Sequence, residues 1–205
     1  MREILFIGHR IPFPPDRGDK IRSHHILKRL ARIAPVHVAT FADDEHDMAE
    51  EVELAALTAS YRLVRRAKPL VLAGIQALAS RQPVSLSAFF DADLDAYVKH
   101  VLAPKQISTI YVFSGQMGQY VPRDFPGRVV CDFVDVDSAK FEAYAARRHQ
   151  AMRWVEAREG RVLRDEEAQL AARADVSLLI SGAEAELFAS RLSAAERQTA
   201  DIRVL

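Results

Sequence analysis

The chain has 205 residues, with 28 Lys and Arg against 28 Asp and Glu, and 49% of its residues are hydrophobic. The balance of charge argues against a nucleic-acid coat protein or a polyacidic binder, and the composition is that of a globular protein. The single cysteine, Cys131, cannot form an internal disulfide, which favours a reducing compartment such as the cytoplasm. No segment approaches the roughly 18 apolar residues of a membrane span, and the first apolar run is too short for a signal peptide.

Short apolar runs recur along the chain and predict buried strands of a parallel sheet. Five of them are at Glu3–Gly8, Val36–Phe41, Ser108–Phe113, Arg128–Val134 and Asp175–Ile180, and two weaker ones are at Tyr61–Arg65 and Ile202–Leu205. Because Ile202–Leu205 resembles the start of a further strand, we expect the sequence to belong to a longer protein.

Stretches with helical spacing separate most of these runs. The first is expected to begin at Asp19 as N-cap, with Ile26, Leu27, Leu30 and Ile33 on its apolar side. The others are Glu45–Ala59, Leu70–Ser80, Asp91–Leu102, Ser138–Ala174, which could divide at Gly160, and Ala183–Leu192. The alternation predicts one α/β, Rossmann-like three-layer domain over residues 1–205 with a mostly parallel sheet.

Basic residues are concentrated at the start of the chain, and the loop from Gly8 to Arg22 carries several of them. Ligands of open parallel sheets bind at the carboxyl ends of strands, where this loop begins. Backbone N–H groups near Gly18 and Asp19, with Arg17, Lys20 and Arg22 beside them, would suit a phosphate or diphosphate. An equally good alternative is that Asp19 does no more than cap the helix, while the basic side chains are solvated. The spacing of glycines does not match the G-x-G-x-x-G motif, which argues against NAD.

Two later loops also follow predicted strands. In the first, Ser114, Gly115 and Gln116 would allow a sugar or a ligand backbone to approach closely, although a turn and a helix cap explain them as well. In the second, Asp132, Asp135 and Asp137 are expected on one side of the strand, with Asp135 binding a substrate hydroxyl or a basic side chain of the first loop. No accompanying His or Glu has ligand spacing, so we expect no metal site.

Several other polar residues favour structural roles. Ser181 and Glu184 have the spacing of a capping box. Of the adjacent His24 and His25, one is expected to face the core or the edge of the sheet. The sequence has no nucleophile elbow, Cys/His pair or zinc motif.

Together, the proline-rich loop with Gly18-Asp19 and Arg22 and three later segments resemble the N-terminal half of a GT-B glycosyltransferase. The later segments are Val-His-Val-Ala-Thr-Phe at 36–41, Asp-Phe-Val-Asp-Val-Asp-Ser-Ala-Lys-Phe at 132–141, and Ala-Asp-Val-Ser-Leu-Leu-Ile-Ser-Gly-Ala-Glu-Ala-Glu at 174–186. The chain is most similar to family 4, and within it to the sugar transferases of exosortase/PEP-CTERM exopolysaccharide systems.

This resemblance implies an acceptor-side domain that faces a C-terminal nucleotide-sugar domain, absent from this sequence. The backbone around Gly18 would approach the donor diphosphate, and Arg22 would line the acceptor side. Transfer would proceed with retention, without a metal or cofactor, to a glycan or a lipid-linked acceptor. Many members have a His after the fourth strand where this chain has Ser114–Gln116, so the resemblance assigns no catalytic residue here. We expect no turnover from this chain alone.

Residues Leu70–Phe90 are rich in apolar side chains and are flanked by Arg65, Arg66, Lys68 and Arg81. This composition is compatible with contact at a membrane surface, but we favour a buried crossover helix. The expected location is the cytoplasm. A lipid-linked acceptor would place the protein at the inner face of the membrane. No nucleic-acid partner is expected.

Two other functions remain open. A sugar-nucleotide epimerase shares the two-domain architecture but should carry carboxylates and His in the cleft loops as acid/base groups. The other possibility is not an enzyme: the chain could be a non-catalytic, flavodoxin-like binding module.

Overall fold

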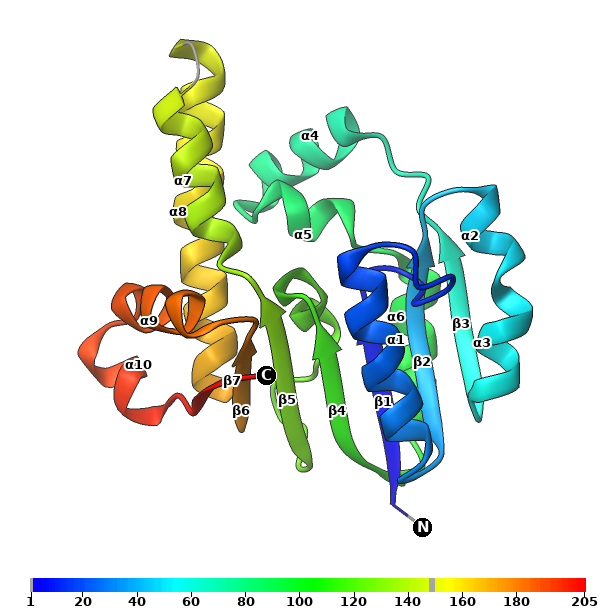
Figure 1. Cartoon of the computed structure of the whole chain (residues 1–205). Helices are drawn as coiled ribbons and strands as arrows, with labels where there is room; N and C mark the ends of the chain where they lie inside the picture. The colour runs from blue at the N-terminus through cyan, green and yellow to red at the C-terminus, as the bar shows by residue number, and fades with distance from the viewer. Residues whose placement is uncertain (1, 148–149) are drawn as a thin grey trace.

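The computed structural model of the chain describes residues 2–147 and 150–205. Its centre is a seven-stranded, all-parallel sheet with the strand order β3-β2-β1-β4-β5-β6-β7 (Figure 1). The strands are β1 (Glu3–Gly8), β2 (Val36–Ala42), β3 (Ser60–Arg65), β4 (Ile107–Phe113), β5 (Arg128–Val134), β6 (Val176–Leu179) and β7 (Ile202–Val204). All seven apolar runs are therefore confirmed as strands.

Helices connect the strands and cover both faces of the sheet, so the α/β, Rossmann-like prediction is confirmed. The helices are α1 (Gly18–Ala31), α2 (Glu45–Ala49), α3 (Glu51–Leu57), α4 (Leu70–Ser80), α5 (Val84–Ala88), α6 (Ala92–Leu102), the 3-10 helix η1 (Gly115–Tyr120), α7 (Asp137–Arg147), α8 (Gln150–Arg173), α9 (Gly182–Arg191) and α10 (Ala194–Thr199).

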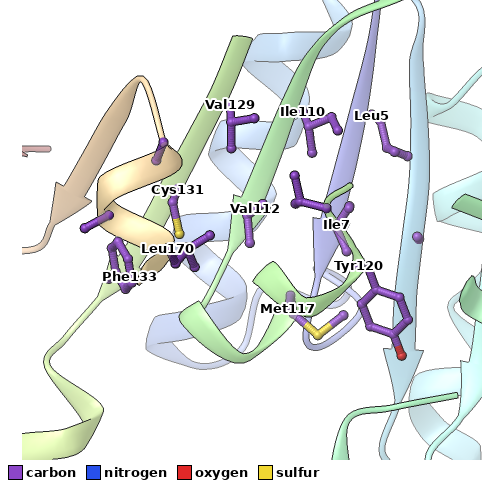
Figure 2. Packing of buried hydrophobic residues seen from close by; sticks show 14 of the residues in the cluster. Leu5, Ile7, Ile110, Val112, Met117, Tyr120, Val129, Cys131, Phe133 and Leu170 are labelled. Atoms are coloured by element: carbon purple, nitrogen blue, oxygen red, sulfur yellow. The ribbon is translucent and has the colours of Figure 1, made fainter. Parts of the chain in front are cut away.

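Two hydrophobic clusters, one on each face, hold these layers together. Leu27 of α1 and Leu54 of α3 pack with Phe6 and other residues of the strands on one face. Residues of α6, η1, α8 and α9 pack on the other face. Figure 2 shows part of this second cluster, in which Leu170 of α8 lies beside Cys131 of β5.

The strand order creates a topological switch point between β1 and β4. The chain leaves β1 toward β2 on one side and leaves β4 toward β5 on the other. The loops that follow β1 and β4 therefore diverge, and the crevice between them is where ligands of open parallel sheets bind.

The first helix differs from the prediction at both ends. It begins at Gly18, so the N-cap position belongs to Arg17, whose side chain makes no capping hydrogen bond. Asp19 lies inside the first turn, which frees its carboxylate for other partners. Ile33 lies beyond the end of α1 and is exposed.

Two predicted helices are divided. The stretch Glu45–Ala59 forms α2 and α3, which meet at Glu50. The long stretch forms α7 and α8, but Gly160 lies inside α8 rather than at the break. Helix α7 is described as far as Arg147 and α8 from Gln150 onward. The pair rises above the sheet as an arm (Figure 1).

Gly160 lets α8 approach α7 closely. A Cβ at this position would lie 3.0 Å from the Ser138 carbonyl oxygen and 2.9 Å from Cγ of Glu142. Gly74 of α4 is a matched helical glycine, where an added Cβ would meet no heavy atom within 4 Å.

We expect Gly160→Ala to lower the free energy of unfolding by about 1–2 kcal/mol, because the clash outweighs the gain in helix propensity. Gly74→Ala should instead raise it by about 0.5–1 kcal/mol. Urea denaturation of both variants checks this, and equal stabilisation of the two would contradict the close approach.

The short helices α5, η1 and α10 were not predicted from the sequence. The structure shows which interactions hold two of them in place. Glu159 of α8 accepts hydrogen bonds from the backbone N–H groups of Val84 and Ser85, so α5 is fixed by a distant residue. Ser193 and Glu196 form a complete capping box at the start of α10. At Ser181 only half of the expected box forms, because the Glu184 carboxylate accepts instead from the Val136 N–H.

The prediction of a buried crossover helix at Leu70–Phe90 is wrong. Among the residues of α4 whose burial the structure describes, only Ala73 and Ala77 are buried, whereas Val71, Leu72, Ile75 and Leu78 are exposed. Instead, α6 packs against β2 and β3 on the way to β4. Among the described residues, no helix combines the length and apolar character needed to cross a membrane.

Candidate functional site at the switch point

The candidate site lies at the carboxyl ends of β1, β4 and β5, below α5 (Figure 1). His9 directly follows β1, and its ring stacks on Phe113 at the end of β4, with ring centroids 5.8 Å apart. The ring of Phe89, which follows α5, packs edge-on with the same imidazole at 6.1 Å. The switch point thus brings a histidine and two aromatic rings together.

His9 is held by Asp19. Its Nε2 lies 3.3 Å from Oδ2 of Asp19, whereas its buried Nδ1 has no hydrogen-bond partner among the described residues. An unpaired buried polar atom is uncommon in folded proteins and requires a reason.

Arg10 links Asp19 to β2. Its guanidinium pairs with the Asp19 carboxylate, and its Nε donates to Oδ2 of Asp43 at 2.6 Å. Arg66 also pairs with Asp43, at 2.9 Å. The hydrogen bond from His9, with a further contribution from the charge of Arg10, holds the pKa of Asp19 well below its usual range. Asp19 is therefore an anion that fixes both His9 and Arg10.

The second part of the site follows β4 and β5, where the backbone is strained at two residues. Ser114 has φ of 77° and Val134 has φ of 68°, values that β-branched residues in particular rarely adopt. Such strain is concentrated at functional sites in proteins. It directs the chain after each strand around a small pocket of about 10 Å³, room for about one water molecule, whose lining includes Gly115, Gln116, Phe133, Asp135, Asp137 and Glu167.

This pocket unites three of the residues that the sequence indicated: Gly115, Gln116 and Asp135. The Ser114 hydroxyl, 2.6 Å from Oε1 of Gln116, orients the amide of that residue. Asp135 accepts a hydrogen bond from Nζ of Lys140 at 2.7 Å and is half-exposed. Amide and carboxylate groups around a strand end can hydrogen-bond a polyhydroxylated ligand.

Glu167 of α8 is a buried acid at the edge of the pocket. Its two oxygens accept hydrogen bonds from the backbone N–H and the hydroxyl of Ser138. Burial nevertheless raises the pKa of Glu167 to about 7 from its ordinary value of 4.5. The side chain can therefore exchange a proton near neutral pH.

The raised pKa has a consequence for stability. Between pH 4.5 and about 7 the unfolded chain releases the Glu167 proton while the folded chain retains it. Stability should thus fall as the pH rises through this window, by about 3 kcal/mol from this residue. We expect Glu167→Gln, which stays neutral, to lose correspondingly less stability between pH 4.5 and pH 8 than the unmodified chain. Urea denaturation at both pH values measures the difference, and parallel pH profiles would contradict the shift.

The cations expected to bind a phosphate have different partners. Lys20 is buried, and its Nζ lies 2.5 Å from Oδ1 of Asp47. Arg22 pairs with Asp132 on the face of the sheet that α1 covers. Only Arg17, beside the exposed Gly18, has no ion-pair partner in the described part of the chain. The loop therefore presents one available cation at the start of α1, rather than a cluster of three.

The expected row of aspartates is also divided. Asp132 is buried and accepts from both Arg22 and the Tyr111 hydroxyl, which is 2.9 Å away. A register shift between Asp132 and Val134 turns Asp135 toward the pocket side. The carboxylate of Asp135 pairs with Lys140 of α7 in place of a basic side chain of the first loop, and the other alternative, a substrate hydroxyl, stays a prediction. His24 is half-buried against Phe13, whereas His25 is exposed. One histidine of the pair therefore packs inward, as expected.

Sequence reasoning missed His9, Arg10 and Glu167 as site residues. His9 and Arg10 directly follow the first strand, so their position at its carboxyl end was a usable signal. Glu167 is separated from β5 by most of an arm of two helices, and nothing in its local sequence marks it.

In the described part of the chain, no group of three His, Cys, Asp or Glu residues is placed to hold a metal ion. Comparison with known proteins gives no family: no protein-family model and no curated protein matches this chain.

Proposed function

We propose that the chain is the acceptor-side domain of a GT-B glycosyltransferase of the family 4 type. The complete protein would transfer a sugar, with retention, from a nucleotide sugar to a glycan or lipid-linked acceptor in exopolysaccharide synthesis in the cytoplasm. The observation that best supports this proposal is the pocket that follows β4 and β5, beside the switch point, which we call the switch-point crevice. Gln116 and Asp135 at its rim carry groups that can hydrogen-bond sugar hydroxyls beside the strained Ser114.

In this proposal the chain positions the acceptor, and a second domain supplies the donor. The start of α1, with exposed Gly18 and Arg17, would face the donor diphosphate, where a cation and free N–H groups stabilise the charge that develops on the leaving group. Asp19 contributes indirectly, because it fixes His9 and Arg10. Arg22 supports the sheet rather than contacting substrate.

The His9–Asp19 pair favours a second candidate, a sugar-nucleotide epimerase of the same architecture. Such an enzyme must remove a proton from a sugar carbon or hydroxyl, and a histidine held by a carboxylate is a common base for that step. The separation of 3.3 Å between His9 Nε2 and Asp19 Oδ2 is compatible with this role.

One experiment distinguishes these functions. Protein translated from the complete reading frame that contains this sequence is incubated with UDP-glucose and with GDP-mannose, and nucleoside diphosphate release is measured. We expect slow donor hydrolysis without acceptor, and faster release when a saccharide acceptor is present. Incubation in D2O, followed by mass analysis of the sugar, identifies an epimerase by incorporation of deuterium.

Matched variants connect the activity to the crevice. We expect Gln116→Ala and Asp135→Ala each to lower kcat/KM for transfer by about tenfold or more, since each removes a hydrogen bond to substrate. Val52→Ala, at an exposed residue of α3, should leave it unchanged. Unchanged transfer in both crevice variants would contradict the proposed site, and sugar transfer by the 205-residue chain alone would contradict the proposed division between two domains.

A further inference from the structure

The outward face of α4 is apolar and exposed. Val71 is 77% exposed, Ile75 61% and Leu78 57%, and their spacing places them along one side of the helix. Ala73 and Ala77, on the opposite side of α4, are buried against the rest of the protein. A contiguous exposed stripe of large apolar side chains is uncommon on a monomeric protein and marks a contact surface.

A second exposed apolar group borders the same region. Trp154, on the arm formed by α7 and α8, is 62% exposed, and the neighbouring Val155 is exposed as well. One turn further along α8, Arg158 donates hydrogen bonds to the carbonyl oxygens of Ala77 and Gln82. Residues four apart lie on the same side of a helix, so Trp154 is on the side of α8 that meets α4. Helix α4 and the arm both lie above the carboxyl edge of the sheet (Figure 1).

Within the two sequence segments that carry these side chains, the charged residues have one sign. From Arg65 to Phe90 the sequence contains four Lys and Arg and no Asp or Glu, and from Ala143 to Val155 it contains three Arg and no acid. Some of these cations have protein partners: Arg65 pairs with Glu45, for example. In contrast, Arg81 and Arg153 are exposed and have no acidic partner in the described ranges.

We propose that the stripe on α4 and Trp154 on the arm together contact an anionic phospholipid surface. Exposed aliphatic side chains, an aromatic residue and cations without acids are the composition of segments that lie in the interface of a bilayer. The chain would rest on the membrane without crossing it. This contact does not depend on sugar transfer, but it would hold the switch-point crevice close to a lipid-linked acceptor.

The chain contains a single tryptophan, Trp154, which provides a local test. The protein is titrated with vesicles of phosphatidylcholine and with vesicles that also contain phosphatidylglycerol, while Trp emission and co-flotation are recorded. We expect a blue shift and flotation with the anionic vesicles, both reduced by salt. Unchanged emission together with protein that stays at the bottom of the gradient would overturn the proposal.

A pair of variants separates this surface from general stickiness. We expect Ile75→Asp to weaken partitioning by about tenfold or more, because it removes a buried apolar contact and adds a repelled charge. Val52→Asp changes a side chain that is 74% exposed on α3 and should have no effect. Circular dichroism confirms that both variants are folded. Equal loss of partitioning in both variants would overturn the assignment. A blue shift that appears without vesicles and grows with protein concentration would also overturn it, because a second copy of the chain would then cover this face.

Discussion

Lys20→Met is expected to lower the free energy of unfolding by about 3–5 kcal/mol. Both Lys20 and Asp47 are buried, and their side chains lie 2.5 Å apart. Lys20 also donates to the carbonyl oxygen of Phe13 at 2.9 Å, so it connects the first loop to α2. Methionine fills a similar volume but leaves the Asp47 carboxylate buried without its counter-charge. Urea denaturation followed by circular dichroism measures the loss.

Two further variants identify the cause. Lys28→Met removes an exposed cation from the same helix and should change stability by less than about 0.5 kcal/mol. Lys20→Met combined with Asp47→Leu should recover a substantial part of the loss, because no unpaired charge remains buried. A loss in the double variant that equals the loss in the single one would show that the charge of Asp47 is not responsible.

Arg22→Met is expected to destabilise the fold by a similar amount, about 3–5 kcal/mol. The guanidinium of Arg22 contacts both oxygens of the Asp132 carboxylate, at 3.0 and 3.1 Å. Asp132 is completely buried, and its remaining partners include the Tyr111 hydroxyl at 2.9 Å. Removal of Arg22 therefore leaves an ionised group in the sheet with too few partners. Thermal and urea unfolding measure the effect.

The matched control is Arg29→Met, because Arg29 is an exposed arginine on the same helix. It should change stability by less than about 0.5 kcal/mol. Tyr111→Phe removes one hydrogen bond to Asp132 and should cost about 1–2 kcal/mol. If Arg22→Met lowered sugar binding but left the stability unchanged, Arg22 would be a substrate residue, as the resemblance implied, and its assignment to the sheet would be wrong.

Strands were the most predictable part of this chain. Each is a short run of apolar residues, since a parallel strand covered on both sides needs little else, and all seven were found. Helix α4 has the same apolar composition as a buried helix but is exposed. Composition cannot distinguish these cases, because burial depends on which element occupies the face of the sheet. Here that element is α6, with the polar Asp91 as its N-cap.

Residues of the candidate site were predictable only where they directly follow a strand. Gln116 and Asp135 could be found in this way, because the carboxyl ends of parallel strands meet at one edge. The ion-pair partner of each charged side chain could not be predicted from the sequence. Arg22 and Asp132 are 110 positions apart in the sequence, and the packing of α1 on the sheet decides their pairing. The same holds for Glu167, whose burial beside Ser138 follows from the way that α8 packs on α7.

Backbone NMR tests the central claim, that the pocket after β4 and β5 beside the switch point binds sugar, most directly. The isotope-labelled 205-residue chain is titrated with a panel of methyl glycosides, and amide shifts are mapped onto the structure. We predict saturable shifts centred on Gly115, Gln116 and Asp135, and their loss in the Gln116→Ala variant. Shifts centred on another part of the chain, or the same shifts in the variant, would contradict the assignment of this crevice as the sugar site.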